Sequence, residues 1–249
     1  MKTPPTPRCA FTLIELLAVI AIIGILAALL FPVVAGAMER GRSSQCRSNL
    51  RQLSAAFLLY SSDHGQLPPS YGYGFDNVFH GDFQDQINDY TEGRANGVWV
   101  CKSIVNRVTK PDAATYAAHG NIFVHRPTAD FANPSHAAYT PLLPMSRMTR
   151  PSQMIAVADT SQIYADGSGG PALTHEAYSD DPAVADTPVD TMYPANLTGN
   201  ADLPKNTLLK TIRYRHDNGR SANAVMLDGH LQSFQTNQIL NRNLSFRNY

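Results

Sequence analysis

Glu15 is the residue whose chemistry most needs an explanation, because it is the one ionisable group in an apolar run from Ala10 to Pro32. A carboxylate at the centre of a membrane helix costs roughly 2.5 to 3.5 kcal/mol on insertion scales. Ionisable residues in such segments are rare and are functional by default. We therefore expect Glu15 either to pair with a positive group or to lie at the lipid headgroups, one turn inside the helix.

Other residue types that could do chemistry are sparse and lack the spacing of known sites. None of the eight histidines belongs to a His-Glu-x-x-His or similar zinc pattern. Acidic residues gather among prolines in the segment 178–190, but they do not follow the order of an EF-hand, so a solvated loop explains them better than a calcium site. The sequence shows no nucleophile–base pair, phosphate loop or serine elbow. We expect no catalytic residue, no metal site and no cofactor.

The element that carries Glu15 is long enough to cross a membrane. Residues 16–38 contain no charge, and as a helix they extend about 34 Å, at about 1.5 Å per residue, against a bilayer core of about 30 Å. The alternative is a secretory signal cut near Ala35-Gly36-Ala37, but the apolar region of such a signal is usually roughly 7–15 residues long. Pro32 bends the helix or removes one hydrogen bond, which membrane helices tolerate.

The helical pattern continues beyond the membrane-length run. Apolar residues recur at spacings of three and four, as on one face of an amphipathic helix, at Cys46, Leu50, Leu53, Phe57 and Tyr60. Gly65 and the prolines after it end the pattern. We expect one helix over residues 11–63, with its transmembrane part at about 13–36. Arg47 and Arg51 on the opposite side form a solvated face rather than a nucleic-acid site, because phosphate tracking needs about 6–10 such contacts.

The remaining residues, 64–249, have the pattern of an α+β head with long loops. Segments 97–104 and 153–160 are rich in β-branched residues, which predicts strands. The clearest strand region extends from about 207 to 235, where Asp228-Gly229 joins two strands as a tight hairpin turn. We expect an antiparallel sheet packed on the C-terminal half of the long helix.

The N-terminus resembles the class III signal of type IV prepilins and type II secretion pseudopilins. A short basic leader, residues 1–10, precedes FTLIELLAVIAIIGILAALLFP, which makes Glu15 the fifth residue of the mature chain. The resemblance implies that prepilin peptidase cuts between Ala10 and Phe11 on the cytoplasmic side of the inner membrane and methylates the Phe11 amine. Ala10 departs from the glycine usual at this position, although it is also small. A count of Lys and Arg alone would instead place the C-terminal side in the cytoplasm.

The C-terminal region resembles prepilin-like proteins, common in planctomycetes and related bacteria, that carry an H-X9-DG segment. In RYRHDNGRSANAVMLDGHLQSF, eleven residues rather than nine separate His216 from Asp228 and Gly229, and we expect a longer loop in DNGRSAN to hold the surplus. The simplest interpretation of the segment is a turn and a histidine at the end of a strand. The resemblance implies the pilin lollipop, in which a long N-terminal helix packs against an antiparallel β-sheet head.

Together the two resemblances imply a structural subunit of a type IV pilus or type II secretion pseudopilus rather than an enzyme. Its partners would be prepilin peptidase, other pilin or pseudopilin subunits, the inner-membrane assembly platform and the lipid bilayer, with no nucleic acid. It would cross the inner membrane once, with an extracytoplasmic head, and could enter a periplasmic or surface filament. There Glu15 would meet the Phe11 amine of a neighbour, since a paired buried charge costs far less than a lone one.

A different class of protein fits the same anchor. An extracytoplasmic binding or enzymatic head could use a pilin-type anchor without polymerising. A polar pocket in the head would favour this alternative, and genes for an assembly ATPase and platform beside this one would favour the filament subunit.

The cysteines bear on how the long helix and the head are joined. Of the three, Cys9 lies in the leader, whose removal would leave Cys46 and Cys101. An even number of cysteines in an extracytoplasmic chain favours a bridge, which would contribute about 2–4 kcal/mol. The alternative is two buried free thiols, because Cys46 lies on the apolar face of the helix.

Overall fold

The structure of the chain is a computed structural model. It describes residues 13–74, 76–91, 97–103, 115–119, 122–126, 128–160, 172–173, 197–198, 212–236, 238–240 and 243–244. The chain divides into two compact units, Met1–Gly41 and Arg42–Tyr249.

The first element, α1, is a helix of 52 residues from Leu13 to His64. It continues through Pro32, whose ring removes one backbone hydrogen bond. Gly65 follows it with a φ of +69°, the left-handed conformation that commonly ends helices. Its most apolar window has a mean hydropathy of 3.0 and no buried residue, so by length and composition this helix can cross a membrane.

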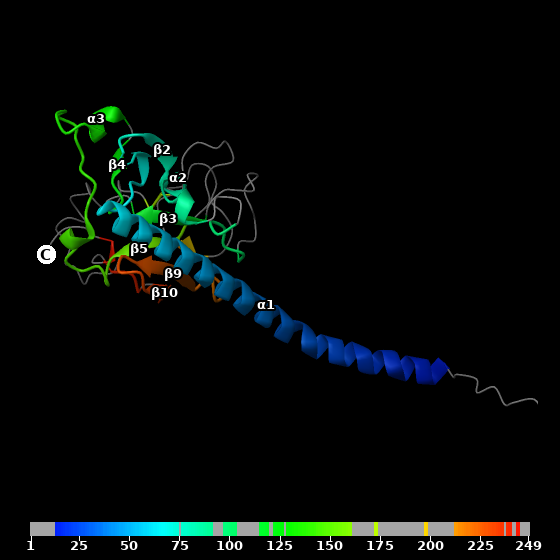
Figure 1. The fold of residues 1–249 in the computed structure, drawn as a ribbon. Helices are drawn as coiled ribbons and strands as arrows, with labels where there is room; N and C mark the ends of the chain where they lie inside the picture. The colour runs from blue at the N-terminus through cyan, green and yellow to red at the C-terminus, as the bar shows by residue number, and fades with distance from the viewer. Residues whose placement is uncertain are drawn as a thin grey trace, which may run out of the picture. The chain divides into compact units, whose positions relative to one another are not determined.

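Five strands form the main sheet of the second unit (Figure 1). The strand order is β10-β9-β5-β3-β6, with bounds β3 Tyr116–His119, β5 Ile155–Asp159, β6 Ala172–Leu173, β9 Ser221–Met226 and β10 Leu231–Gln235. Neighbouring strands are antiparallel except β3 and β6, which are parallel. Strands β9 and β10 form the hairpin whose turn contains Asp228 and Gly229.

Smaller elements surround this sheet. A three-stranded sheet has the order β2-β1-β4, with bounds β1 Tyr71–Tyr73, β2 Phe79–Asp82 and β4 His125–Arg126. A parallel pair joins β7 Leu197–Thr198 to β8 Arg213–Tyr214. The short helices are α2 Phe83–Gln86, η1 Asn88–Tyr90, α3 Ala129–Ala132 and η3 Met145–Arg147.

The C-terminal half of α1 packs on one face of the main sheet, and in Figure 1 it lies across β3, β5 and β9. The core cluster at this contact includes Cys46, Leu50, Leu53 and Phe57 of α1 and Tyr116, Val157 and Val225 of the sheet. A second cluster covers the opposite face and includes Ile155, Ala224, Met226, Phe234 and Leu244. The apolar residues from which the amphipathic helix was predicted are therefore the ones through which α1 contacts the sheet. The expected α+β class is confirmed.

One predicted strand is wrong. Residues 97–103 form turns, in which the Val100 N–H donates to the Gly97 carbonyl at 3.2 Å and Gly97 has a φ of +71°. The apolar residues of this segment are buried in the core. Burial alone accounts for their type, because an apolar side chain can enter a core from a turn as well as from a strand. By contrast, β5 lies within the predicted strand 153–160.

Candidate functional site

The predicted processing and assembly residues lie at the beginning of the chain. Ala10 and Phe11 lie outside the described residues. Glu15 is in the first turn of α1, where its side chain is exposed. A carboxylate is favourable at this place because the N-terminus of a helix carries a partial positive charge.

Cys46 and Cys101 meet at the contact between α1 and the head. The structure joins them in a disulfide, with a Cα–Cα distance of 5.0 Å, and both side chains are buried. The Lys102 N–H donates to Cys46 Sγ at 3.1 Å. This disulfide joins α1 to the turns at 97–103. The two cysteines are 55 positions apart in the sequence.

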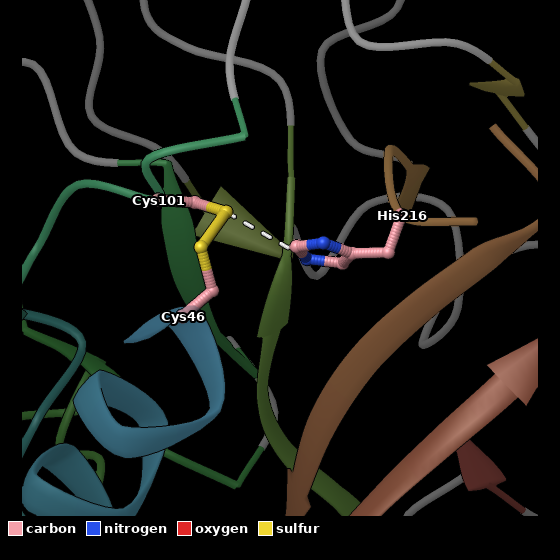
Figure 2. Close-up of side chains that lie close together, drawn as sticks. All are labelled: Cys46, Cys101 and His216. Carbon is pink, nitrogen blue, oxygen red and sulfur yellow. Dashed lines mark hydrogen bonds between the residues drawn. A yellow bond between two sulfur atoms is a disulfide. The ribbon is translucent and has the colours of Figure 1, made fainter. Parts of the chain in front are cut away.

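His216 lies beside this disulfide (Figure 2). Its Nε2 is 3.6 Å from Cys101 Sγ and 3.1 Å from Asp159 Oδ2. A carboxylate can only accept, so Nε2 carries the proton in this contact. The backbone of His216 bridges to Ser221 at the start of β9, which places the longer loop of the motif at residues 217–220. The histidine is therefore anchored by both its backbone and its ring.

Asp159, the last residue of β5, connects this histidine to a buried arginine. Its Oδ2 accepts the Asn223 N–H at 2.7 Å, and its Oδ1 is 3.8 Å from Arg215 Nε. Arg215 Nη2 also donates to the Thr160 carbonyl. All of these side chains are buried. An isolated buried carboxylate would be very costly, so the opposite charge of Arg215 and the hydrogen bonds are what make this position tolerable.

Tyr116 and His119 of β3 are also buried, and burial shifts the pKa of each. Burial raises the pKa of Tyr116 well above its ordinary value, and the negative charge of Asp159 adds to this effect. The Tyr116 hydroxyl donates to the Cys46 carbonyl at 3.3 Å. Burial also lowers the pKa of His119 from 6.5 to about 4, and the ring contacts the Leu244 carbonyl through Nε2 at 2.7 Å. Both side chains are therefore held neutral at physiological pH.

The Asp-Gly turn lies against α1 at a second place. Gly229 has a φ of +95°, and a Cβ on it would lie 2.7 Å from Leu58 Cδ1 and 3.1 Å from Ser54 Oγ. The Ser54 hydroxyl donates to the Gly229 carbonyl at 3.1 Å. Asp228 accepts the His230 N–H through Oδ1 at 3.1 Å, which closes the turn. Glycine is required here by both the backbone conformation and the close approach of the helix.

The His216 and Gly229 ends of the segment thus reach α1 at two points, near Cys46 and at Ser54. This arrangement fastens the main sheet to the helix. Sequence reasoning named His216, Asp228 and Gly229 but missed Asp159 and Arg215. The available signals were a carboxylate at the end of an otherwise apolar strand and an arginine directly before the histidine.

Comparison with known families finds two matches. Residues 6–31 match the prokaryotic N-terminal methylation motif, and residues 36–104 match a protein family of unknown function, DUF1559. The two matches confirm the resemblance to the type IV prepilin and pseudopilin superfamily, and they identify a prepilin-like N-terminus followed by a membrane-anchoring helix. No curated protein and no solved structure matches the chain significantly.

Proposed function

We propose that the chain is a structural, non-enzymatic subunit of a type IV pilus or of a type II secretion pseudopilus. The observation that carries the proposal is the methylation motif at residues 6–31, which includes the first part of α1, a helix with an exposed apolar surface there. Prepilin peptidase cuts the chain between Ala10 and Phe11 and methylates the new amine. Residues 1–10 then leave, and the mature chain begins at Phe11, two residues before the start of α1.

The apolar surface of α1 supports a function in lipid and in a filament. Large apolar side chains from Leu13 to Met38 are 45–80% exposed in the single chain. Full burial of one such side chain contributes roughly 1.5–3 kcal/mol. The bilayer covers this surface before assembly, and the same segments of neighbouring subunits cover it in the filament.

Glu15 sets the axial register of assembly. In the filament core its carboxylate pairs with the methylated Phe11 amine of a neighbouring subunit. Removing one partner of a buried ion pair typically costs 3–5 kcal/mol, whereas a shifted subunit would leave both charges without a partner. The pair therefore selects the correct register more than it adds stability.

The proposal also specifies the place of the protein in the cell. The subunit crosses the inner membrane once, with residues 64–249 outside the cytoplasm. Its partners are prepilin peptidase, other subunits of the filament and the inner-membrane assembly platform. The buried disulfide between Cys46 and Cys101 supports an extracytoplasmic head, because disulfides persist in oxidising compartments.

The test is the Glu15→Gln variant, expressed in cells that assemble the filament. The amide is nearly isosteric, so helix packing is preserved while the negative charge is lost. We expect normal cleavage and membrane insertion, and at least a tenfold loss of subunits in the sheared or cross-linked filament fraction, given about 1.4 kcal/mol per factor of ten. Glu39→Gln makes the same chemical change beyond the apolar run and is the matched control.

Normal filament content of the processed Glu15→Gln protein would contradict this proposal. Glu15 would then be only an acid at the membrane interface. A head that is anchored in the membrane but never enters a filament, in the variant or in the wild type, would favour the non-polymerising alternative.

A further inference from the structure

The atoms Cys46 Sγ, Cys101 Sγ and His216 Nε2 all lie within 4.8 Å of one another. They come from α1, from the turns at 97–103 and from the start of the β8–β9 loop, and Figure 2 shows the ring of His216 directed at the sulfur of Cys101. All three side chains are buried. Thiolate and imidazole are the ligands that zinc prefers.

We propose that these three residues form a zinc site when the cysteines are reduced. The same two sulfur atoms hold either the disulfide or the cation. In both states α1 stays fastened to residues 97–103. This site is independent of whether the chain enters a filament.

The observed distances suit a tetrahedral cation. Bonds of about 2.3 Å to sulfur and about 2.0–2.1 Å to nitrogen or oxygen place the ligand atoms of one zinc ion about 3.3–3.8 Å apart. Cys101 Sγ lies 3.6 Å from His216 Nε2, within this range. The change required on reduction is a separation of the two sulfur atoms to about 3.8 Å.

The surrounding charges and hydrogen bonds also suit the cation. Two thiolates, the Asp159 carboxylate, the Arg215 guanidinium and a divalent cation together carry no net charge, so the filled site adds no unbalanced charge to the core. The Lys102 N–H already donates to Cys46 Sγ, as backbone amides do at thiolate ligands.

The chemistry balances with a reductant and a cation. A dithiol or phosphine supplies two electrons that break the S–S bond, and two protons complete the thiols. The cation then displaces both thiol protons. The imidazole of His216 changes tautomer, so that Nδ1 carries the proton and the Nε2 lone pair meets the cation.

The test uses the full mature chain in detergent micelles, reduced with a phosphine under anaerobic conditions, with Co²⁺ as the optical probe. We expect one Co²⁺ per chain, with a thiolate-to-cobalt charge-transfer band and the strong visible bands of tetrahedral coordination, and complete displacement by Zn²⁺. The oxidised chain should give no such spectrum.

Variants assign the ligands. His216→Gln should lower the affinity for Co²⁺ at least tenfold, while His119→Gln, which changes an equally buried histidine outside the cluster, should leave it unchanged. Absence of the charge-transfer band in the reduced wild type, or equal affinity in His216→Gln, would overturn the proposal. Fluorescence of the buried Trp99 reports the fold, and a reduced chain that unfolds and is not refolded by Zn²⁺ would overturn it as well.

Discussion

Replacing Gly229 with alanine tests how the β9–β10 turn fastens the sheet to α1. Two costs follow from the structure. At a φ of +95° an alanine Cβ is strained by about 1–2 kcal/mol relative to glycine. The new Cβ would also lie 2.7 Å from Leu58 Cδ1, so the Leu58 side chain has to turn away, at about 0.5–1.5 kcal/mol.

Together these costs predict that Gly229→Ala destabilises the head by about 1.5–3.5 kcal/mol. Gly65→Ala is the matched control, because Gly65 has a φ of +69° and nothing within 4 Å of its Cβ position. It should cost only the backbone part, about 1–2 kcal/mol. Urea unfolding of the mature chain in micelles, followed by Trp99, the single tryptophan, gives the free energy of unfolding for each variant.

A double-mutant cycle isolates the contact with the helix. Leu58→Ala removes the atom that the new Cβ would meet, so Gly229→Ala should cost about 1 kcal/mol less in the Leu58→Ala background than in the wild type. Equal costs for Gly229→Ala and Gly65→Ala, together with no coupling to Leu58, would refute the close approach of this turn to α1.

Three further predictions concern other parts of the chain. Ala10→Gly should not reduce cleavage, and slower processing on an immunoblot would contradict the assignment of the cut. The mature chain, unfolded without reductant, should leave an alkylating reagent unreacted, because Cys46 and Cys101 are bonded; labelling of both thiols would contradict this. Since the pKa of His119 is about 4 in the folded chain and 6.5 ordinarily, the unfolded chain gains a proton first as the pH falls, and stability should decrease by roughly 3 kcal/mol between about pH 6.5 and about pH 4. His119→Gln should remove most of that decrease in urea unfolding at about pH 7.5 and about pH 4.5.

The elements with strong local patterns could be predicted from the sequence. The apolar run and the spacing of three and four predicted one long helix over 11–63, and α1 extends from Leu13 to His64. The Asp228-Gly229 pair predicted the hairpin turn, because its chemistry is local. In each case neighbouring residues determine the structure.

The failures have one physical origin. The sequence of residues 97–103 resembles that of a strand because its side chains are of the apolar types that enter a core. In the structure these residues form turns, and contacts with residues distant in sequence hold them, such as the Cys101 N–H donating to Thr115 Oγ1 at 2.6 Å. The contact between Asp159 and His216 joins residues 57 positions apart. The spacing of residues along the chain does not predict such a contact, so only the folded structure shows it.

The central claim is that this chain is processed as a prepilin, and the mass of its mature N-terminal peptide tests it most directly. The protein is isolated from membranes of cells that contain prepilin peptidase, and its N-terminal peptide is sequenced by tandem mass spectrometry. Processing as a prepilin predicts a peptide that begins at Phe11 and carries one additional methyl group on its amine. A mature chain that begins at Met38, or an intact chain that begins at Met1, would contradict it.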